Sequence, residues 1–217
     1  GEVVGFRTAS FKNAIQFKNK NYMSSGGYIL VTDTLFNKAA IFIKKEGLLQ
    51  TAIFKNNLYF GGIDGLYIKE KDTLKKVKNN LLDVSISYLL TTNSSLFVGT
   101  DGRGVYLYNN KKVIHLKHTE GYSVQKIIKK DNFLWLATNK GVHQLTLNTS
   151  NVENSKITNS FYEADGLLQN NINDIYIEKD TLFTASDVGI SKLNINNKIY
   201  KQKPNIYFKT QNDTLHF

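Results

Sequence analysis

The 217-residue sequence has no cysteine and only one proline. The missing cysteines exclude a disulfide scaffold and a zinc site with thiolate ligands, and they leave the cellular compartment open. No apolar run approaches the roughly 18 residues of a membrane-spanning helix, and no stretch has the 3.6-residue apolar period of an amphipathic helix. Hydrophobic residues make up 41% of the sequence, which is typical of a folded globular protein.

Arginine is also scarce, although the net charge is +10. The only arginines are Arg7 and Arg103, and the positive excess comes almost entirely from lysines that stand singly or in pairs such as Lys75-Lys76. Arginine is the residue that proteins use most often to contact bases and phosphates. We therefore expect a solvated, lysine-rich surface and no nucleic-acid binding by this segment.

One short motif recurs along the chain. It consists of an apolar pair, two small residues, a polar turn with glycine, and a second alternating stretch. The clear copies have as anchors Leu58, Leu96, Leu134 and Leu182, spaced by 38, 38 and 48 residues, and a weaker copy places Tyr22 36 residues before Leu58. Such a recurrence indicates a repeat protein. No Gly-Lys-Ser/Thr and no helix pattern follow the glycines, so we interpret them as hairpin turns and not as phosphate-binding loops.

Each copy predicts four short strands separated by polar residues. Four strands in each unit of about 40 residues are typical of a β-propeller, in which every unit forms one blade. We predict an all-β propeller of four-stranded blades with five blades visible, at residues 11–45, 48–77, 84–118, 123–162 and 172–202. Residues 1–203 thus hold the blades. Pro204 marks the boundary to residues 204–217, which we expect to begin a following β-sandwich domain or to form a tail.

The small residues at the end of each second strand have a structural explanation. A bulky side chain there would crowd the next blade, because neighbouring blades bury each other's faces. The small pairs are Gly61-Gly62, Gly99-Thr100, Ala137-Thr138 and Ala185-Ser186. The turns that follow carry Asp64, Asp101, Asn139 and Asp187. Asp and Asn are favoured in turns because they form local hydrogen bonds, and we expect that role here.

Several copies match a known repeat. Residues 163–190 read "EADGLLQNNINDIYIEKDTLFTASDVGI", and further copies lie at residues 44–66 and at residues 118–142, the latter with Trp135. These segments resemble the two-component regulator propeller repeat. The segment from Pro204 is similar to the opening of the triple-tyrosine domain that follows such propellers.

The resemblance implies a larger propeller, with seven blades or two rings, and further blades before Gly1. It implies a ligand-sensing module in a Bacteroidetes-type signal-transduction receptor, located in the periplasm on the extracytoplasmic side of the inner membrane. The kinase or transcription-factor output would lie in other parts of the parent protein. Contact with the membrane is likewise expected only through those parts.

Residues suited to catalysis are few. His115 and His143 lie in alternating strands, where a satisfied sheet residue is the simpler interpretation, and His118 is the most plausible functional histidine. The paired carboxylates of a glycosidase or lyase would have to come from Glu120, Glu163, Asp165 and Asp187. No loop has the D-x-D-x-D pattern of a calcium site. We expect no enzyme activity, metal or cofactor in this segment. The alternatives are a lyase or hydrolase acting on a glycan or cyclic peptide, and a scaffold used for homodimerisation.

The candidate ligand site lies on one face of the predicted propeller. The connections between successive blades share a face with the turns between strands two and three, and these connections carry aromatic, amide and carboxylate side chains. Such groups suit stacking on a sugar ring and hydrogen bonding to its hydroxyls, so we predict a small-molecule or oligosaccharide ligand. The candidate contacts are Arg103, Asp101, Glu120, Tyr122, Tyr162, Gln169, Asn170 and Asn171. Arg103 is the principal one, because its turn is one residue longer than the turn at Asn139-Lys140.

Overall fold

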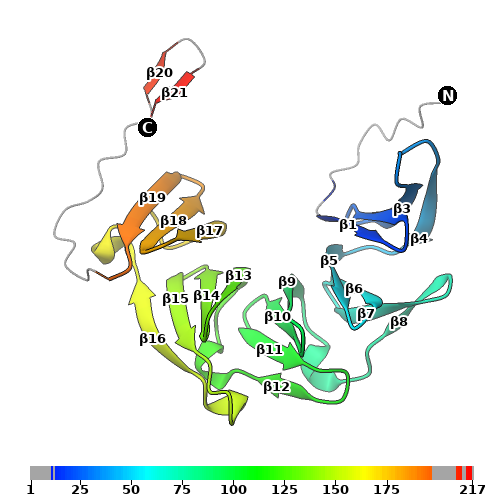
Figure 1. Cartoon of the computed structure of the whole chain (residues 1–217), viewed down its shortest axis with the longest axis horizontal. Coiled ribbons are helices and arrows are strands. Elements are labelled where there is room, and N and C mark those ends of the chain that lie inside the picture. The colour runs from blue at the N-terminus through cyan, green and yellow to red at the C-terminus, as the bar shows by residue number, and fades with distance from the viewer. Residues whose placement is uncertain (1–10, 12, 197–208, 212–213, 217) are drawn as a thin grey trace. The chain divides into compact units, whose positions relative to one another are not determined.

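The computed structural model describes residues 11, 13–196, 209–211 and 214–216. These residues fold almost entirely into antiparallel β-sheets (Figure 1). The chain forms two compact units, one ending at Ser123 and one beginning at Val124. In each sheet the strands pair with their neighbours in the sequence, which confirms the predicted all-β fold of four-stranded meanders. We call each sheet a blade and number the blades in chain order.

The first unit holds three complete blades. Blade 1 comprises β1 (Asn13–Phe17), β2 (Lys20–Ser24), β3 (Tyr28–Asp33) and β4 (Ala39–Lys44). Blade 2 comprises β5 (Leu48–Phe54), β6 (Asn57–Gly62), β7 (Gly65–Glu70) and β8 (Thr73–Lys76). Blade 3 comprises β9 (Ile86–Thr91), β10 (Leu96–Thr100), β11 (Val105–Tyr108) and β12 (Val113–His115).

The second unit holds two further blades. Blade 4 comprises β13 (Val124–Lys130), β14 (Phe133–Thr138), β15 (Gly141–Thr146) and β16 (Lys156–Phe161). Blade 5 has three described strands, β17 (Asp174–Glu178), β18 (Thr181–Ser186) and β19 (Gly189–Asn194). This blade was predicted to extend to residue 202, and its part from residue 197 onward lies outside the described residues. The strands β20 (Lys209–Gln211) and β21 (Thr214–His216) pair with each other, and the domain predicted at residues 204–217 stays a prediction.

Alternate residues of a strand face the two neighbouring blades. In blade 2, Leu58 and Phe60 belong to the apolar cluster shared with blade 1, whereas Tyr59 belongs to the cluster shared with blade 3. In the second unit, Trp135 is 1% exposed and stacks on Phe161 with ring centroids 6.0 Å apart. The apolar runs of the second strands in blades 2, 3 and 4 are therefore buried on both faces, as expected for a sheet that is covered on both sides.

The role predicted for the small residues holds at Gly61. A Cβ atom on Gly61 would lie 2.6 Å from Cγ2 of Ile86 and 3.1 Å from its Cβ. Ile86 is the first residue of β9 in blade 3 and is fully buried. A side chain at Gly61 would therefore collide with the next blade.

The weak copy of the motif in blade 1 aligns differently from the prediction. In blades 1 and 2 the second strand follows a two-residue turn, formed by residues 18–19 and 55–56. Tyr22 is therefore the counterpart of Tyr59, and Asn21 is the counterpart of Leu58. The predicted alignment of Tyr22 with Leu58 was wrong by one residue, because blade 1 has a polar residue at the anchor position.

The third blade was predicted to extend to residue 118, but its last strand, β12, ends at His115. The hydroxyl of Thr119 donates to the Leu116 carbonyl at 2.7 Å and accepts from the Val105 amide at 2.8 Å. These bonds fold residues 117–119 into the 3-10 turn η2. The other single turns are η1 (Asn80–Leu82), η3 (Val152–Asn154) and η4 (Glu163–Asp165).

Candidate functional site

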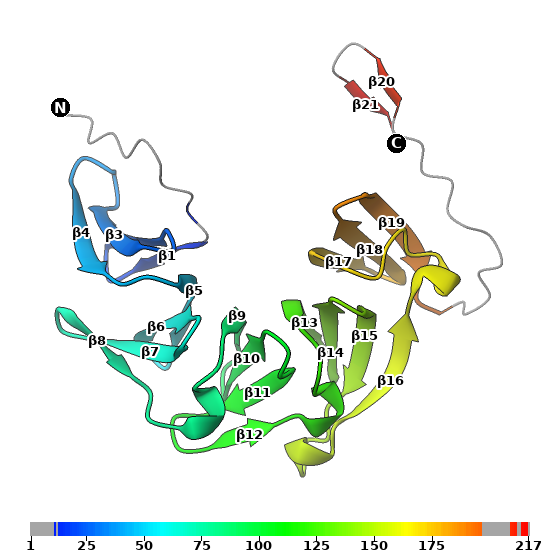
Figure 2. The same cartoon turned by 180° about the vertical axis from the view of Figure 1, so that it is seen from behind.

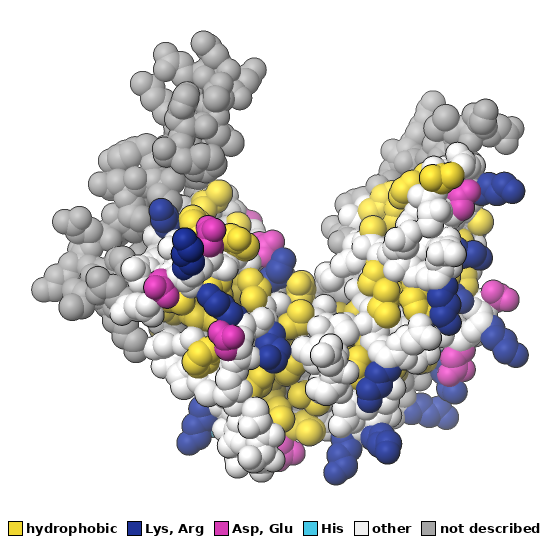
Figure 3. All heavy atoms as spheres, viewed as in Figure 1, with side chains coloured by type: hydrophobic (Ala, Val, Ile, Leu, Met, Phe, Trp, Pro, Cys, Tyr) yellow, Lys and Arg dark blue, Asp and Glu magenta, His cyan; other side chains and the backbone are white. Residues whose placement is uncertain are grey.

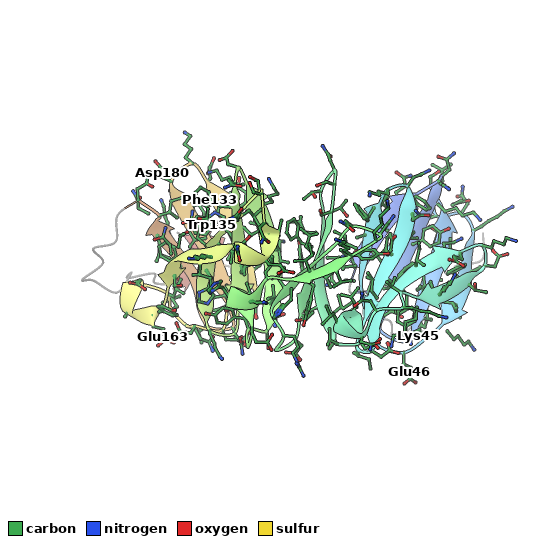
Figure 4. All side chains as sticks on the ribbon, turned by 90° about the horizontal axis from the view of Figure 1, so that it is seen from below. Lys45, Glu46, Phe133, Trp135, Glu163 and Asp180 are labelled. Carbon is green, nitrogen blue, oxygen red and sulfur yellow. The ribbon has the colours of Figure 1, made fainter. Side chains whose placement is uncertain are left out.

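In each unit, the crossovers between blades and the turns between strands two and three lie at one end of the blades. We call this the turn–crossover end. The opposite, hairpin end holds the turns that join strands one and two and strands three and four. In the second unit, Figure 4 places Glu163 of a crossover at one edge, and Asp180 and Phe133 beside hairpin turns toward the other. Figure 2 gives the view in which the turn–crossover end of the first unit faces the reader.

Backbone hydrogen bonds fix the crossovers to the turns beside them. The amide of Gly47, in the crossover between blades 1 and 2, donates to the carbonyl of Gly26 at 2.5 Å. The carbonyl of Gly47 accepts from the amide of Ile63 at 2.9 Å, so one crossover links the turns of two successive blades. In the second unit, the amide of Gly141 donates to the carbonyl of Asn170 at 2.6 Å. Loops held in this way provide a rigid base for side chains at this end.

A hydroxyl group closes most of the turns between strands two and three. It belongs to the second small residue of the motif and donates to the carbonyl of the turn glycine. The pairs are Thr100–Gly104 at 2.7 Å, Thr138–Gly141 at 2.9 Å and Ser186–Gly189 at 3.1 Å. The blade-3 turn is one residue longer than the other two, in agreement with the sequence, and it is the turn that carries Arg103.

The turn aspartates bond to crossover residues, where the sequence led us to expect bonds within the turns. The bonds are Lys45 Nζ to Asp64 Oδ2 at 3.1 Å, Ser123 Oγ to Asp101 Oδ1 at 2.6 Å, and Asn173 Nδ2 to Asp187 Oδ1 at 2.6 Å. Their carboxylates thus add to the links between turns and crossovers. Figure 4 shows Lys45 with its neighbour Glu46 at this edge of the first unit.

The contacts of Asp64 stabilise its ionised form. Its Oδ2 also accepts a 2.6 Å hydrogen bond from the Tyr67 hydroxyl. Partial burial alone would raise the pKa of Asp64, but the hydrogen bonds from Tyr67 and Lys45 outweigh it and lower the pKa. The same contacts outweigh burial at Lys45 and raise its pKa. The pair is therefore an ion pair at neutral pH.

In blade 3, the structure brings Arg103 and Glu120 together. Arg103 Nη1 lies 4.0 Å from Glu120 Oε1, and the two side chains are 64% and 50% exposed. Glu120 Oε2 lies 3.1 Å from Nε2 of His115, which is also 3.1 Å from the Arg103 carbonyl oxygen. His115 in turn stacks on Tyr106, with ring centroids 4.5 Å apart. Arg103 and Glu120 form a loose, solvent-facing pair that a polar ligand can approach.

Asp101 and Tyr122 lie in the same turn and crossover. Asp101 accepts the hydrogen bond from Ser123, and its amide donates to the Ser85 carbonyl at 2.9 Å. Tyr122 is half-buried, and its carbonyl accepts from the Gly104 amide at 3.0 Å. Both residues therefore hold the turn against the crossover, and they lie in the same loops as Arg103 and Glu120.

In the second unit, Tyr162 and Asn170 lie in the crossover between blades 4 and 5. Tyr162 is 40% exposed and meets the ring of His143 edge-on, with centroids 5.8 Å apart. Asn170 Oδ1 accepts from the Glu163 amide at 2.9 Å, and Glu163 Oε1 accepts from the Asn170 amide at 3.1 Å. The Asn170 side chain thus folds this crossover back on itself. Of Tyr162 and Asn170, Tyr162 is the residue that faces solvent.

Gln169 and Asn171 flank Asn170 and are half-buried. Gln169 Oε1 is buried without a hydrogen-bond partner among the described residues. The eight predicted contacts therefore fall into two groups, one in each unit. Each group lies at the turn–crossover end of its own unit.

A row of side chains on the first strands was not predicted from the sequence. They stand eight residues before each anchor position: Asn13, Gln50, Tyr88, Lys126 and Asp174. A bulge precedes the row in β5, β9 and β13, and bulges re-aim the side chains next to them. Asn13 Nδ2 donates to Gln50 Oε1 at 3.1 Å, and Lys126 Nζ lies 3.0 Å from Asp174 Oδ1. The constant spacing could have revealed this row from the sequence, but only once Asn21 is taken as the anchor residue of blade 1.

His143 is fully buried beneath the same end of blade 4. Its Nδ1 lies 2.8 Å from the Ser160 hydroxyl. Burial lowers the pKa of His143 to about 4, although a hydrogen bond involving the backbone of Lys140 acts in the opposite direction. The imidazole is therefore neutral at physiological pH and inaccessible, as expected for a structural histidine.

Among the described residues, no three His, Asp or Glu side chains gather as metal ligands would. His115 contacts one carboxylate, that of Glu120, and the backbone carbonyl of Arg103. No helix within the described ranges is long and apolar enough to cross a membrane.

No protein-family model and no curated protein matches the sequence. The chain is similar in structure to the WD40 β-propeller domain of Doa1, with a TM-score of 0.65 and 12% sequence identity over 88% of this chain and 67% of that one. The fold is a β-propeller. The separate four-stranded meanders of both units are its blades.

Two bacterial structures are also similar. One is the extracellular domain of BT4673 from B. thetaiotaomicron, described as a hybrid two component system, with a TM-score of 0.63 and 15% identity over 88% of this chain. The other is PorZ, a surface component of the type-IX secretion system of Porphyromonas gingivalis, with a TM-score of 0.60 and 14% identity over 87% of this chain. The propeller chain spans only 28% and 27% of those two chains.

Proposed function

We propose that this propeller is the extracytoplasmic ligand-sensing module of a bacterial signal-transduction receptor of two-component type. Its ligand is a small molecule, and an oligosaccharide fits the side chains best. The module passes the signal to a kinase or transcription-factor output elsewhere in the parent protein. It carries out no chemistry itself.

The observation that carries the proposal is the construction of the turn–crossover end. Crossovers and turns are joined by backbone bonds such as those of Gly47 and Gly141, so exposed side chains sit on a rigid base. In the first unit, Arg103 and Glu120 supply a donor and an acceptor of opposite charge, and Tyr122 in the same crossover as Glu120 supplies a half-buried ring. Sugar recognition uses this combination of planar hydrogen bonding and ring stacking.

The likeness to the extracellular domain of BT4673 supports a sensory role, since that domain is described as part of a hybrid two component system. At 15% identity the likeness is one of fold, and fold alone does not carry function. Residues 163–190 also resemble the two-component regulator propeller repeat in sequence, although no family model matches the chain.

A scaffold is the second candidate function. PorZ has nearly the same structural similarity and is a surface component of a secretion system. In a scaffold, the turn–crossover end would contact a protein, such as a second copy of the chain, and Arg103 would serve that interface.

The experiment is a glycan-array screen of the full chain, followed by calorimetric titration of each hit. We expect Arg103→Ala and Glu120→Gln to weaken binding of the hit by roughly tenfold each, because a charge-assisted hydrogen bond contributes about 1.5–3 kcal/mol and the lower end of this range applies to side chains as exposed as these. Lys111→Ala, which removes an exposed cation at the hairpin end of the same blade, is the matched control and should leave binding unchanged. A screen without hits, together with self-association that depends on Arg103, would favour the scaffold.

A further inference from the structure

One hairpin of the first unit exposes two large apolar side chains at its tip. In the turn between β3 and β4, Leu35 is 77% exposed and Phe36 is 63% exposed. The first residues of β4, Ala39 and Ala40, are exposed beside them, and Ile41 is 42% exposed. We call these five exposed apolar residues the blade-1 tip.

The tip is held in one conformation by Asp33. The Asp33 carbonyl accepts from the Phe36 amide at 3.2 Å, and Asp33 Oδ1 accepts from the Asn37 amide at 2.8 Å. The Asp33 amide donates to the Lys38 carbonyl at 3.2 Å, which closes the turn. Leu35 and Phe36 are thus presented on an ordered turn.

The architecture does not require an apolar turn at this place. The corresponding turn of blade 2 is formed by Lys71 and Asp72, and that of blade 3 by residues 109–112, which read "NNKK". Both are polar and exposed except for Asn109, which is half-buried. The blade-1 tip therefore differs from its counterparts in the same unit by its chemistry and not by its position.

Lysines surround the tip and cover the rest of the hairpin end of the first unit. Those in or beside its turns are Lys18, Lys20, Lys38, Lys55, Lys69, Lys71, Lys111 and Lys112. The acidic residues in the same turns are Asp33, Glu70 and Asp72. Figure 3 shows dark-blue side chains around this unit together with exposed yellow ones. The hairpin end of the first unit is therefore strongly basic.

The turn–crossover end of the same unit is nearly balanced in charge. Three of its carboxylates pair with cations: Asp64 with Lys45, Asp83 with Lys76, and Glu120 with Arg103. The charge of the first unit is thus polarised between its two ends, a feature that the total of +10 for the whole chain conceals.

We propose that the hairpin end of the first unit docks on an anionic phospholipid bilayer. Leu35 and Phe36 enter the interface between headgroups and acyl chains, and the surrounding lysines contact the headgroup phosphates. Apolar side chains with a basic surround are the combination that binds anionic membrane surfaces. In this orientation the turn–crossover end points away from the bilayer and is open to ligand.

The residue types favour a bilayer over a nucleic acid or a folded protein. A nucleic acid would gain nothing from Leu35 and Phe36, and no arginine lies among the described residues of the hairpin end of this unit. An acidic protein surface would need a pocket for the protruding tip, whereas a bilayer can take up the tip at any point of its surface. The contact orients the module and does not replace an anchor in other parts of the parent protein.

The test is co-sedimentation of the full chain with vesicles. Vesicles of phosphatidylcholine with phosphatidylglycerol should bind the chain, and vesicles of phosphatidylcholine alone should not. Leu35→Ser combined with Phe36→Ser should weaken partitioning by roughly tenfold. Lys→Gln changes at Lys18, Lys20 and Lys38 should weaken it by roughly fivefold per lysine, and added salt should weaken it further.

A matched double variant removes exposed apolar residues from the other end. Ile63 and Leu81 are 56% and 46% exposed at the turn–crossover end, and Ile63→Ser with Leu81→Ser should leave partitioning unchanged. Circular dichroism must show that all variants fold. Equal binding to both kinds of vesicle would overturn the proposal. An equal loss of vesicle binding in the two apolar double variants would also overturn it. So would binding to a DNA duplex that is as tight as binding to the anionic vesicles and is unaffected by Leu35→Ser with Phe36→Ser.

Discussion

Gly61→Ala tests how the blades pack. The new methyl group would lie 2.6 Å from Cγ2 of Ile86, about 1 Å closer than an ordinary carbon contact. Overpacking of this kind costs about 1–3 kcal/mol. Replacing glycine also lowers the conformational entropy of the unfolded chain, which stabilises the folded state by about 0.4–1 kcal/mol. We expect a net loss of about 1–2 kcal/mol in the free energy of unfolding, measured by urea denaturation followed by circular dichroism.

Two further variants make the cause specific. Gly27→Ala is the matched control, because a Cβ atom there would meet nothing within 4 Å, and it should be neutral or slightly stabilising. Ile86→Ala alone should cost about 2–5 kcal/mol. Combined with Gly61→Ala it should cost about 1–2 kcal/mol less than the sum, because the added methyl fills part of the cavity. Additive effects, or a neutral Gly61→Ala, would refute the packing argument.

Two other predictions concern buried polar groups. Because the folded-state pKa of His143 is about 4 and its ordinary value is near 6.5, the unfolded chain takes up the proton first as the pH falls. Stability is therefore lost between about pH 6.5 and pH 4, by about 2 kcal/mol at pH 5, and His143→Phe should flatten this part of the pH profile of the melting temperature. Thr138→Val should cost about 1–3 kcal/mol in urea denaturation, because the buried Gly141 carbonyl and Lys140 amide lose a partner. Thr146→Val, at a more exposed hydroxyl pair, should cost less than 1 kcal/mol, and equal costs would contradict this account.

The repeat itself was predictable because packing imposes its period on the sequence. Leu58, Leu96, Leu134 and Leu182 mark the second strands, and all four are buried. Gly61 was predictable for the same reason, since its place is set by the next blade. Blade 1 was misaligned because Asn21 hydrogen-bonds to Thr32 and Asp33 instead of packing as an apolar anchor.

The candidate site was only partly predictable. The sequence indicates which loops share an end of a blade, and it singles out the longer turn of Arg103. It does not reveal that Glu120 lies beside Arg103 or that Asn170 is bonded to Glu163, because these contacts depend on how each crossover folds. The polarisation of lysines in the first unit was hidden for a similar reason, since a net charge does not say at which end of a blade each lysine lies.

The central claim is that the turn–crossover end binds ligand, and amide chemical-shift mapping tests it most directly. The full chain, labelled with ¹⁵N, would be titrated with the glycan that gives the strongest signal in the array screen. We predict saturable shifts at the amides of Arg103, Gly104 and Glu120, and none at Asn19 and Asn56 in the hairpin turns. Saturable shifts confined to the hairpin end, with the amides around Arg103 unmoved, would contradict the claim.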